Sequence, residues 1–310
     1  MVVGGYALGP ELGSGAFGQV YKGLARKTGR VVAIKETARS AEGIKEWDVM
    51  SLVSGHAHVV QAIELIEHAQ RVFYILEYAH GGDLFTYAKR YGFKLPEEDV
   101  RTITRQIVAA LQHINARGVA HFDLKPANVL FRDAEHSHIL LADFGAAKLL
   151  DKPDRLFTRP AGTVQYMAPE VLACYHGAED AAGEDVPRGF SKLADNWSLG
   201  ILVHVLLHGC FPFALHKDEQ TTPLQHIRAQ LKAILARRQL FIGNCAQSPC
   251  STDVQDFINR LLEISPARRM TLAEARAHPW LRGAQASKHG RDDSPAESSS
   301  AQGGKRPRLG

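Results

Sequence analysis

Cysteine is scarce in this sequence of 310 residues, which contains only Cys174, Cys210, Cys245 and Cys250. No two of them have the Cys-x-x-Cys spacing that is typical of zinc-binding and redox motifs. Structural disulfides are characteristic of secreted domains and are rare in the reducing cytosol. We therefore expect four free thiols in an intracellular protein, rather than a disulfide framework or a zinc site.

Long hydrophobic runs are also absent. The longest apolar stretch, at residues 201–207, includes His204 and is far shorter than the roughly 20 residues that a membrane-spanning helix needs. Residues 1–5 have neither the basic region nor the apolar core of a signal peptide. Val2 stands where N-myristoylation requires glycine. These absences predict a protein that has no membrane partner.

Neither sign of charge is in large excess. The sequence has 37 Lys and Arg against 33 Asp and Glu, which gives a net charge of +4. So small an excess favours an ordinary solvated surface over one that binds nucleic acid directly. Hydrophobic residues make up 45% of the chain. Because single cores stop growing near about 250–300 residues, we expect two lobes.

Two hydrophobic patterns divide the chain. Residues 31–34 and 72–76 are short β-rich apolar runs, and a helical pattern that ends at Gly55 lies between them. After Gly82 the pattern becomes helical, and the proline and acids at residues 96–99 are a helix start. We expect further helices at residues 195–207 and 253–262. The patterns predict an α+β fold, with a small β-rich lobe containing one helix and a larger, mainly helical lobe.

A glycine-rich stretch at residues 13–20 has the pattern Gly-x-Gly-x-x-Gly. Glycines let the backbone approach a polyphosphate closely and point N–H groups at it. Alone the pattern is weak, because it also occurs in dinucleotide-binding folds and in ordinary loops. A dinucleotide fold places a helix directly after the glycines, whereas residues 19–23 have the pattern of a strand. The glycines are therefore expected in a hairpin.

Lys35 ends an apolar strand, where a lysine is most often an ordinary surface residue. On a buried strand it would need an anionic partner, and Glu46 in the following helix offers one. Glu42, one turn earlier, is the alternative partner. A Lys–Glu ion pair can hold the ammonium group toward a bound phosphate.

Three oxygen-bearing side chains follow the long helix. Asp123 and Asn128 lie five residues apart in one loop, and Asp143 opens a later Asp-Phe-Gly sequence. Phosphoryl transfer needs a carboxylate that orients the hydroxyl group and oxygen ligands that hold Mg²⁺. Each residue alone is more often a turn or capping residue, but their order and spacing together favour the catalytic interpretation.

With these motifs the sequence resembles the eukaryotic protein kinase superfamily over roughly residues 6–282. The resemblance implies a bilobal kinase fold with an ATP-binding N-lobe at residues 1–78 and a C-lobe at residues 79–282. Residues 283–310 have almost no large apolar side chains and are expected to be a disordered basic tail. The implied function is a non-specific Ser/Thr protein kinase that transfers the γ-phosphate of ATP, with Mg²⁺, to protein substrates.

The resemblance also implies roles for single residues. Asp123 matches the base that accepts the substrate proton, and Asn128 and Asp143 match the metal ligands. Lys35 matches the lysine on the ATP phosphates, and Glu46 matches its ion-pair partner. The other implied catalytic residues are Lys125 and Thr163, which also favour serine and threonine over tyrosine as acceptors.

The implied ATP-binding residues come from the glycine-rich stretch, the strand of Lys35, the hinge and the region after the catalytic loop. Leu76 matches the gatekeeper, and Glu77 and Ala79 match the hinge residues whose backbone contacts adenine. Asp83 is expected near the ribose and the substrate. The full set is Leu12, Gly13, Ser14, Gly15, Ala16, Phe17, Gly18, Val20, Ala33, Lys35, Leu76, Glu77, Ala79, Asp83 and Leu130.

Matches outside the ATP site concern the C-lobe framework. Residues 168–170 resemble the end of the activation segment, and Arg269 resembles the arginine that pairs with its glutamate. Asp195 resembles the aspartate that binds the backbone of the catalytic loop. Residues 172–190 are longer than usual for the family and rich in small and acidic residues, so we expect a surface insertion there.

The sequence departs from the family pattern at Phe122, where most members have an arginine that binds a phosphate on the activation loop. The His-Phe-Asp sequence is similar to that of the death-associated kinases, which are active. We therefore expect activity that does not require phosphorylation near Thr158. Ala127 stands where many basophilic kinases have glutamate, which predicts at most a modest preference for basic substrates.

Two other functions are less consistent with the sequence than a protein kinase. A pseudokinase that only binds ATP or acts as a scaffold usually lacks the lysine, the base or the metal-binding aspartate, and this chain has all three. A small-molecule kinase is disfavoured by Thr163 and residues 168–170, which resemble a platform for peptides.

Residues 305–308 are a basic cluster that indicates nuclear import, through the import machinery, or an ordinary solvated tail. We expect a monomer located in the nucleus, the cytoplasm or both.

Overall fold

The computed structural model describes residues 1–15, 18–152, 154–176, 178, 186–213, 222–236 and 250–283, without the side chains of Ala41 and Glu42. Several predictions therefore concern residues outside this description. They are the roles of Ala16 and Phe17, the alternative partner Glu42, the thiol of Cys245, the middle of the 172–190 insertion, and the tail from residue 284 onward.

The N-terminal part of the chain is an antiparallel sheet with the strand order β1-β2-β3-β4-β6-β5. The strands are β1 (Val2–Val3), β2 (Tyr6–Gly15), β3 (Gly18–Ala25), β4 (Val31–Ala38), β5 (Ala62–His68) and β6 (Arg71–Glu77). Alternate residues of β6 face opposite sides of the sheet, as the period of a strand requires. Phe73 and Ile75 pack in a small cluster with Val32 and Ile34, whereas Tyr74 belongs to the main core.

The glycine-rich stretch forms the predicted hairpin. β2 pairs with β3 as far as Gly15 and Gly18, and no helix follows the glycines, which excludes a dinucleotide fold. Gly18 has a φ of +122°, and a Cβ atom there would lie 2.2 Å from the carbonyl oxygen of Glu36. At Gly13, by contrast, nothing lies within 4 Å of such an atom. Gly18 is thus required by the close packing of β4, while Gly13 leaves open space beside the hairpin.

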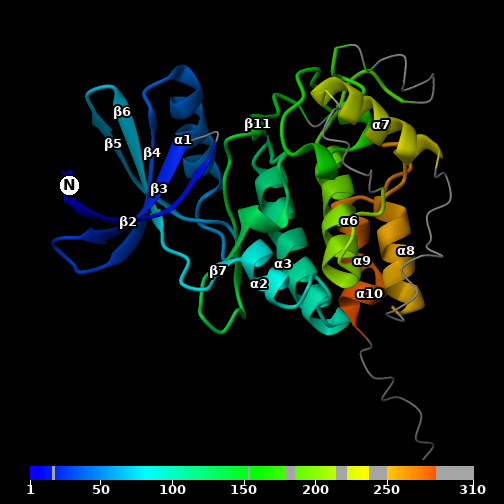
Figure 1. Cartoon of the computed structure of the whole chain (residues 1–310), viewed down its shortest axis with the longest axis horizontal. Helices are drawn as coiled ribbons and strands as arrows, with labels where there is room; N and C mark the ends of the chain where they lie inside the picture. The colour runs from blue at the N-terminus through cyan, green and yellow to red at the C-terminus, as the bar shows by residue number, and fades with distance from the viewer. Residues whose placement is uncertain are drawn as a thin grey trace, which may run out of the picture.

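Helix α1 (Ala41–Val53) connects β4 with β5 and packs against the sheet (Figure 1). It begins after Ser40, whose hydroxyl group accepts a hydrogen bond from the Gly43 amide at 3.1 Å. Val49, Met50 and Val53 are buried on its inner face. Gly55, just beyond the end of the helix, has a φ of +92°, which agrees with the predicted stop.

Helices dominate the C-terminal part, which lies to the right of the sheet in Figure 1. They are α2 (Leu84–Arg90), α3 (Glu97–Ala116), α4 (Pro169–Leu172), α6 (Leu193–His208), α7 (Pro223–Ala236), α8 (Thr252–Leu261), α9 (Leu272–Ala277) and α10 (Pro279–Arg282). The helices predicted after Pro96 and at residues 195–207 and 253–262 correspond to α3, α6 and α8. Every residue of α6 from Ala194 to His208 is buried, so α6 is the central helix of this lobe. The fold is the predicted bilobal α+β arrangement.

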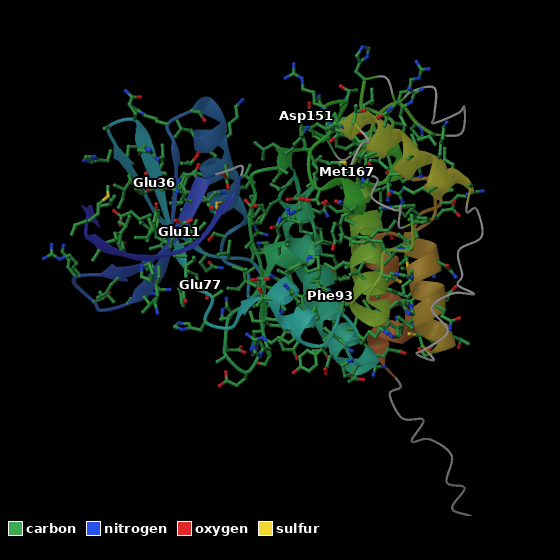
Figure 2. The ribbon with its side chains drawn as sticks, in the orientation of Figure 1. Glu11, Glu36, Glu77, Phe93, Asp151 and Met167 are labelled. Atoms are coloured by element: carbon green, nitrogen blue, oxygen red, sulfur yellow. The ribbon has the colours of Figure 1, made fainter. Side chains whose placement is uncertain are left out.

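Short elements between the two lobes hold the loops that carry the candidate site. They are β7 (Gly82–Asp83), β8 (Val119–Ala120), η1 (Pro126–Asn128), β9 (Val129–Phe131), β10 (Ile139–Leu141), β11 (Lys148–Leu149) and η2 (Val164–Tyr166). Glu77, the last residue of β6, lies on the side of the sheet that faces the helices (Figure 2). Among the described residues, no helix is long and apolar enough to cross a membrane.

The surface location predicted for residues 172–190 is wrong at both described ends. Leu172, Val186 and Phe190 are all buried. Phe190 forms a β-bridge with Phe157 through two backbone hydrogen bonds of 2.8 and 2.9 Å. The small and acidic residues that suggested a surface insertion occur mainly in the middle of this stretch. Its ends carry apolar residues that pack into the helical lobe.

Candidate active site

Lys35 is the centre of an ion-pair network that joins the two lobes. From β4 its Nζ atom contacts Glu46 Oε1 on α1 at 2.6 Å and Asp143 Oδ1, beyond β10, at 3.0 Å. Lys35 and Glu46 are buried, with 7% and 8% of their surface exposed. The predicted Lys35–Glu46 pair is therefore present, and Asp143 is a second partner that the sequence did not indicate.

The surroundings of Lys35 favour its charged form. Burial alone would lower the pKa of the lysine, but the negative charges of Asp143 and Glu46 outweigh this effect and raise it. For Asp143, burial raises the pKa, but the charge and hydrogen bond of Lys35 outweigh it and lower the pKa below its usual range. In Glu46 burial is the larger effect, and the pKa is raised. At neutral pH Lys35 and Asp143 thus form an ionised pair.

A second network surrounds Asp123 in the loop between β8 and η1. Thr163 Oγ1 donates to Asp123 Oδ1 at 2.7 Å, and Lys125 Nζ contacts Asp123 Oδ2 at 2.7 Å and Thr163 Oγ1 at 2.8 Å. Asn128 Nδ2 donates to the Asp123 carbonyl oxygen at 2.8 Å and to Oδ2 at 3.0 Å. The structure thus brings together four of the predicted residues, and the contacts fix the direction of one carboxylate.

Helix α6 holds the loop of Asp123 in place through Asp195. Asp195, completely buried, accepts hydrogen bonds from the backbone amides of His121 at 2.8 Å and Phe122 at 2.7 Å, as predicted. Phe122 has a φ of +60°, a conformation that costs energy in any residue other than glycine and persists only when its surroundings enforce it. The two hydrogen bonds to Asp195 provide that enforcement directly before Asp123.

Three further contacts tie the loop of Asp123 to its neighbours. His121 Nε2 lies 3.0 Å from the carbonyl oxygen of Ala142, the residue before Asp143, and the His121 ring contacts Phe144. Gly162 has a φ of +105°, and a Cβ atom there would lie 2.1 Å from the Phe122 carbonyl oxygen. Only glycine fits at this position, which brings Thr163 within reach of Asp123.

The predicted metal ligands offer a suitable set of atoms. Mg²⁺ is usually bound by carboxylate and carbonyl oxygens. Asn128 uses its amide nitrogen to bind Asp123, and within the described chain its side-chain oxygen accepts no hydrogen bond. Asp143 is ionised and keeps a carboxylate beside Lys35. Both residues therefore fit a role in holding magnesium.

The predicted ATP-binding residues lie along neighbouring strands. Val20 pairs with Lys35 across β3 and β4, and Ala33 pairs with Leu76 across β4 and β6. Leu130 pairs with Asp83 across β9 and β7. Exposed residues of this set lie in β2: Leu12, Gly13 and Ser14.

Two of the expected ATP contacts have other partners as well. The Asp83 carboxylate caps α2, because it accepts from the Thr86 amide at 2.7 Å and from the Thr86 hydroxyl group at 2.9 Å. The Glu77 carboxylate binds Arg132 Nε at 2.7 Å, which connects the end of β6 to the residue that follows β9. Ala79, between these elements, donates its amide to no other residue in the described ranges, so this hinge N–H group remains available.

A buried ion pair closes the predicted activation segment. Arg269 Nη1 and Nη2 bind Glu170 Oε1 and Oε2 at 2.6 and 2.9 Å, as the resemblance implied. Both side chains are inaccessible to solvent, with 0% and 1% exposed. The guanidinium group also lies over the Trp197 ring, 5.2 Å from its centroid. The segment is thus fixed to the centre of the helical lobe.

An aromatic cluster surrounds Phe122, and no pattern in the sequence indicated it. The Phe122 ring contacts Phe157 and Phe190 with centroid distances of 5.5 and 5.0 Å. Lys148 lies over both of these rings and donates to the Arg159 carbonyl oxygen at 2.6 Å. The cluster joins the loop of Asp123 to the segments around Phe157 and Phe190. These two segments lie close together because a backbone bridge connects Phe157 with Phe190.

Comparison with known proteins agrees with this geometry. The model of the protein kinase domain family matches residues 6–281. A probable myosin light chain kinase of Dictyostelium discoideum is 33% identical over 282 residues, which is 90% of this chain and 82% of that protein. The calcium/calmodulin-dependent protein kinase cmkA of Emericella nidulans is 33% identical over 288 residues, 91% of this chain and 63% of that kinase.

The serine/threonine-protein kinase ULK3 of Homo sapiens is 32% identical over 287 residues, which cover 89% of this chain and 55% of ULK3. The chain therefore spans less than two thirds of two of these three relatives. The family model nevertheless covers both lobes and the residues of the two networks. With a family model that matches nearly the whole described chain and relatives of this identity, the chain belongs to the eukaryotic protein kinase family, Ser/Thr type.

Proposed function

We propose that this chain transfers the γ-phosphate of ATP to serine and threonine hydroxyl groups of proteins. The observation that carries the proposal is the Asp123 carboxylate, which Thr163 and Lys125 hold at 2.7 Å each. A carboxylate fixed in this way accepts the proton of a substrate hydroxyl group, while the oxygen of that hydroxyl group attacks the γ-phosphorus atom of ATP. The bond from that phosphorus atom to the β,γ-bridging oxygen breaks, and ADP leaves.

The other residues of the two networks orient the reactants. The Lys35 ammonium group, held by Glu46, binds the phosphates of ATP, and Lys125 offsets charge on the phosphoryl group as it moves. Asn128 and Asp143 would hold magnesium, which neutralises phosphate charge when it is bound. Leu76, Ala33 and Leu130 supply apolar contacts for the adenine ring of ATP. The Ala79 amide supplies a hydrogen-bond donor to the same ring. The glycine-rich hairpin, Glu77 and Asp83 belong to the same proposed ATP site.

A transfer assay tests the proposal. Purified chain is incubated with magnesium and γ-labelled ATP in the presence of a generic basic protein, and the labelled amino acids are identified after hydrolysis. We expect label on serine and threonine, and none when Asp143→Asn replaces the wild type. Label on tyrosine alone, or ATP binding without any transfer by the wild type, would count against the proposal.

Activity without phosphorylation of the activation loop is the second part of the proposal. A loop phosphate usually pairs with an arginine beside the catalytic aspartate, and here that position is the buried Phe122. The contacts of Phe122 with Phe157 and Phe190, together with Lys148, connect the loop to the helical lobe without any phosphate. These contacts support a segment that is ordered by its own side chains.

Thr158→Ala is therefore expected to change kcat by less than about twofold, the usual range for an exposed side chain without essential contacts. Thr158 is exposed beside the aromatic cluster. Initial rates of the two proteins at saturating ATP and substrate provide the measurement, and Thr163→Ala serves as the sensitive control because its hydroxyl group binds Asp123. Loss of activity in Thr158→Ala, with unfolding behaviour unchanged, would show that loop phosphorylation is needed.

A modest preference for basic substrates is also proposed. Ala127 is exposed and has no charge, and the carboxylate of Asp83 already caps α2. Neither residue therefore offers a strong site for arginine in a substrate. A peptide array in which several arginines were required would contradict this expectation.

Nuclear import through residues 305–308 and a monomeric state are further proposals. Fusion of residues 283–310 to a fluorescent reporter tests the import signal, and a reporter that stays evenly distributed would count against it. Sedimentation of the full chain over a range of concentrations tests the monomer.

A further inference from the structure

Tyr74 is a buried polar residue in β6 that has no part in the networks described above. Its side chain is 0% exposed, and its hydroxyl group donates to the backbone carbonyl oxygen of Gly43 at 2.5 Å. The ring also contacts Trp47, with the centroids 5.8 Å apart. Tyr74 is thus attached at two points to α1, the helix that carries Glu46.

The position of Tyr74 relates these contacts to Lys35. In the register of β4 and β6, Tyr74 lies directly opposite Lys35. Gly43 lies three residues before Glu46, so both are on the same face of α1. These contacts form a closed ring. Lys35 pairs with Tyr74 in the sheet, and Tyr74 binds the first turns of α1. From the same helix, Glu46 contacts Lys35 at 2.6 Å.

Gly43 gives a second, independent indication. Glycine within a helix is destabilising by roughly 0.5–1 kcal/mol relative to alanine. A Cβ atom at this position would lie 3.1 Å from the Tyr74 hydroxyl oxygen and 3.3 Å from the Ala38 carbonyl oxygen. A side chain at residue 43 would therefore require the Tyr74 hydroxyl group and the Ala38 carbonyl group to give way by a few tenths of an ångström.

The Tyr74 hydroxyl group stays a donor over the whole working range of pH. Burial raises the pKa of the phenol, and the negative charge of Glu46 raises it further. The neutral O–H group is therefore the form that faces the Gly43 carbonyl oxygen, which can only accept.

We propose that Tyr74 is a positioning residue that sets the location of Glu46 relative to Lys35 through its hydrogen bond to the first turns of α1. The proposal rests on the function inferred above, because Glu46 holds the Lys35 ammonium group that binds the phosphates of ATP. Tyr74 itself is fully buried and is not among the residues proposed to bind ATP.

Tyr74→Phe removes the hydroxyl group and keeps the ring. Loss of one hydrogen bond corresponds to about a fivefold change, and we expect amides 44–46 to exchange with deuterium about that much faster, while β5 and β6 are unchanged. We expect kcat to fall by a similar factor and KM for ATP to change less. Tyr6→Phe is the matched control, since its hydroxyl group binds Glu64 in the same sheet, away from α1, and it should leave both measurements unchanged.

A double-mutant cycle separates positioning from general stability. If Tyr74 acts through Glu46, Tyr74→Phe should have almost no further effect on kcat in a Glu46→Gln background, whereas independent effects would multiply. Multiplying effects, or unchanged exchange in α1, would overturn the proposal. A wild type without kinase activity would contradict the proposed function alone, because deuterium exchange in α1 still decides whether Tyr74 positions the helix.

Discussion

Asp123→Asn is expected to lower kcat for phosphate transfer by about 10³-fold, within the range that a positioned general base contributes. The amide has almost the same shape as the carboxylate. Its oxygen can still accept from Lys125 and Asn128, and its nitrogen can donate to Thr163 Oγ1 in place of the bond that Thr163 donates in the wild type. What is lost is the negative charge that accepts the proton of the substrate hydroxyl group. ATP affinity should change little, because Asp123 is not among the residues proposed to bind ATP.

Steady-state rates at saturating ATP and substrate measure this effect. Asp253→Asn is a suitable control, because it makes the same chemical change at an exposed position in the first turn of α8. We expect the control to retain wild-type kcat. A decrease of less than about tenfold in Asp123→Asn would place the base elsewhere.

The second large effect is expected on stability. Arg269→Ala should lower the free energy of unfolding by about 3–5 kcal/mol, because it leaves the Glu170 carboxylate buried without its partner. Arg269 also donates to the backbone oxygens of Glu263, Leu193 and Ile264. Those acceptors would lose their donor in the same step.

The neighbouring arginine supplies the control for this prediction. Arg268 contacts Glu263 at 3.0 Å, but 74% of its side chain is exposed. An exposed pair of this kind contributes roughly 0–1 kcal/mol, so Arg268→Ala should scarcely move the urea unfolding midpoint. Equal effects of the two substitutions would contradict the buried role of Arg269. Glu170→Gln combined with Arg269→Met should recover part of the loss, since no unpaired charge then remains.

Local patterns in the sequence were sufficient for much of the fold. The buried residues of α3 repeat with helical spacing, and acids occupy its first turn, so both its existence and its start could be predicted. The hairpin of the glycine-rich stretch followed from strand residues directly after the glycines. The Lys35–Glu46 pair was also predictable, because α1 follows β4 after two residues and its register leaves few acidic candidates.

Contacts between segments that are distant in the sequence could not be predicted in this way. Nothing near Phe122 in the sequence indicates Phe157 or Phe190 as its neighbours, because their approach depends on a bridge between two separate loops. The Lys35–Asp143 contact crosses from one lobe to the other, and its existence depends on how the lobes are placed. The hydrogen bond of Tyr74 depends on the tilt of α1 over the sheet, which no periodic pattern determines. Such contacts follow from packing in three dimensions rather than from local preference.

The most direct test of the account is the initial rate of transfer by chain that carries no phosphate. The protein is treated with a phosphatase, its intact mass is checked, and transfer to serine and threonine is followed from the first seconds after ATP is added. We expect a linear time course, at the rate of untreated protein, because we propose that the aromatic contacts of Phe122 order the activation segment without a phosphate. A lag that ends only when Thr158 or a neighbouring residue has become phosphorylated, or no transfer at all, would contradict it.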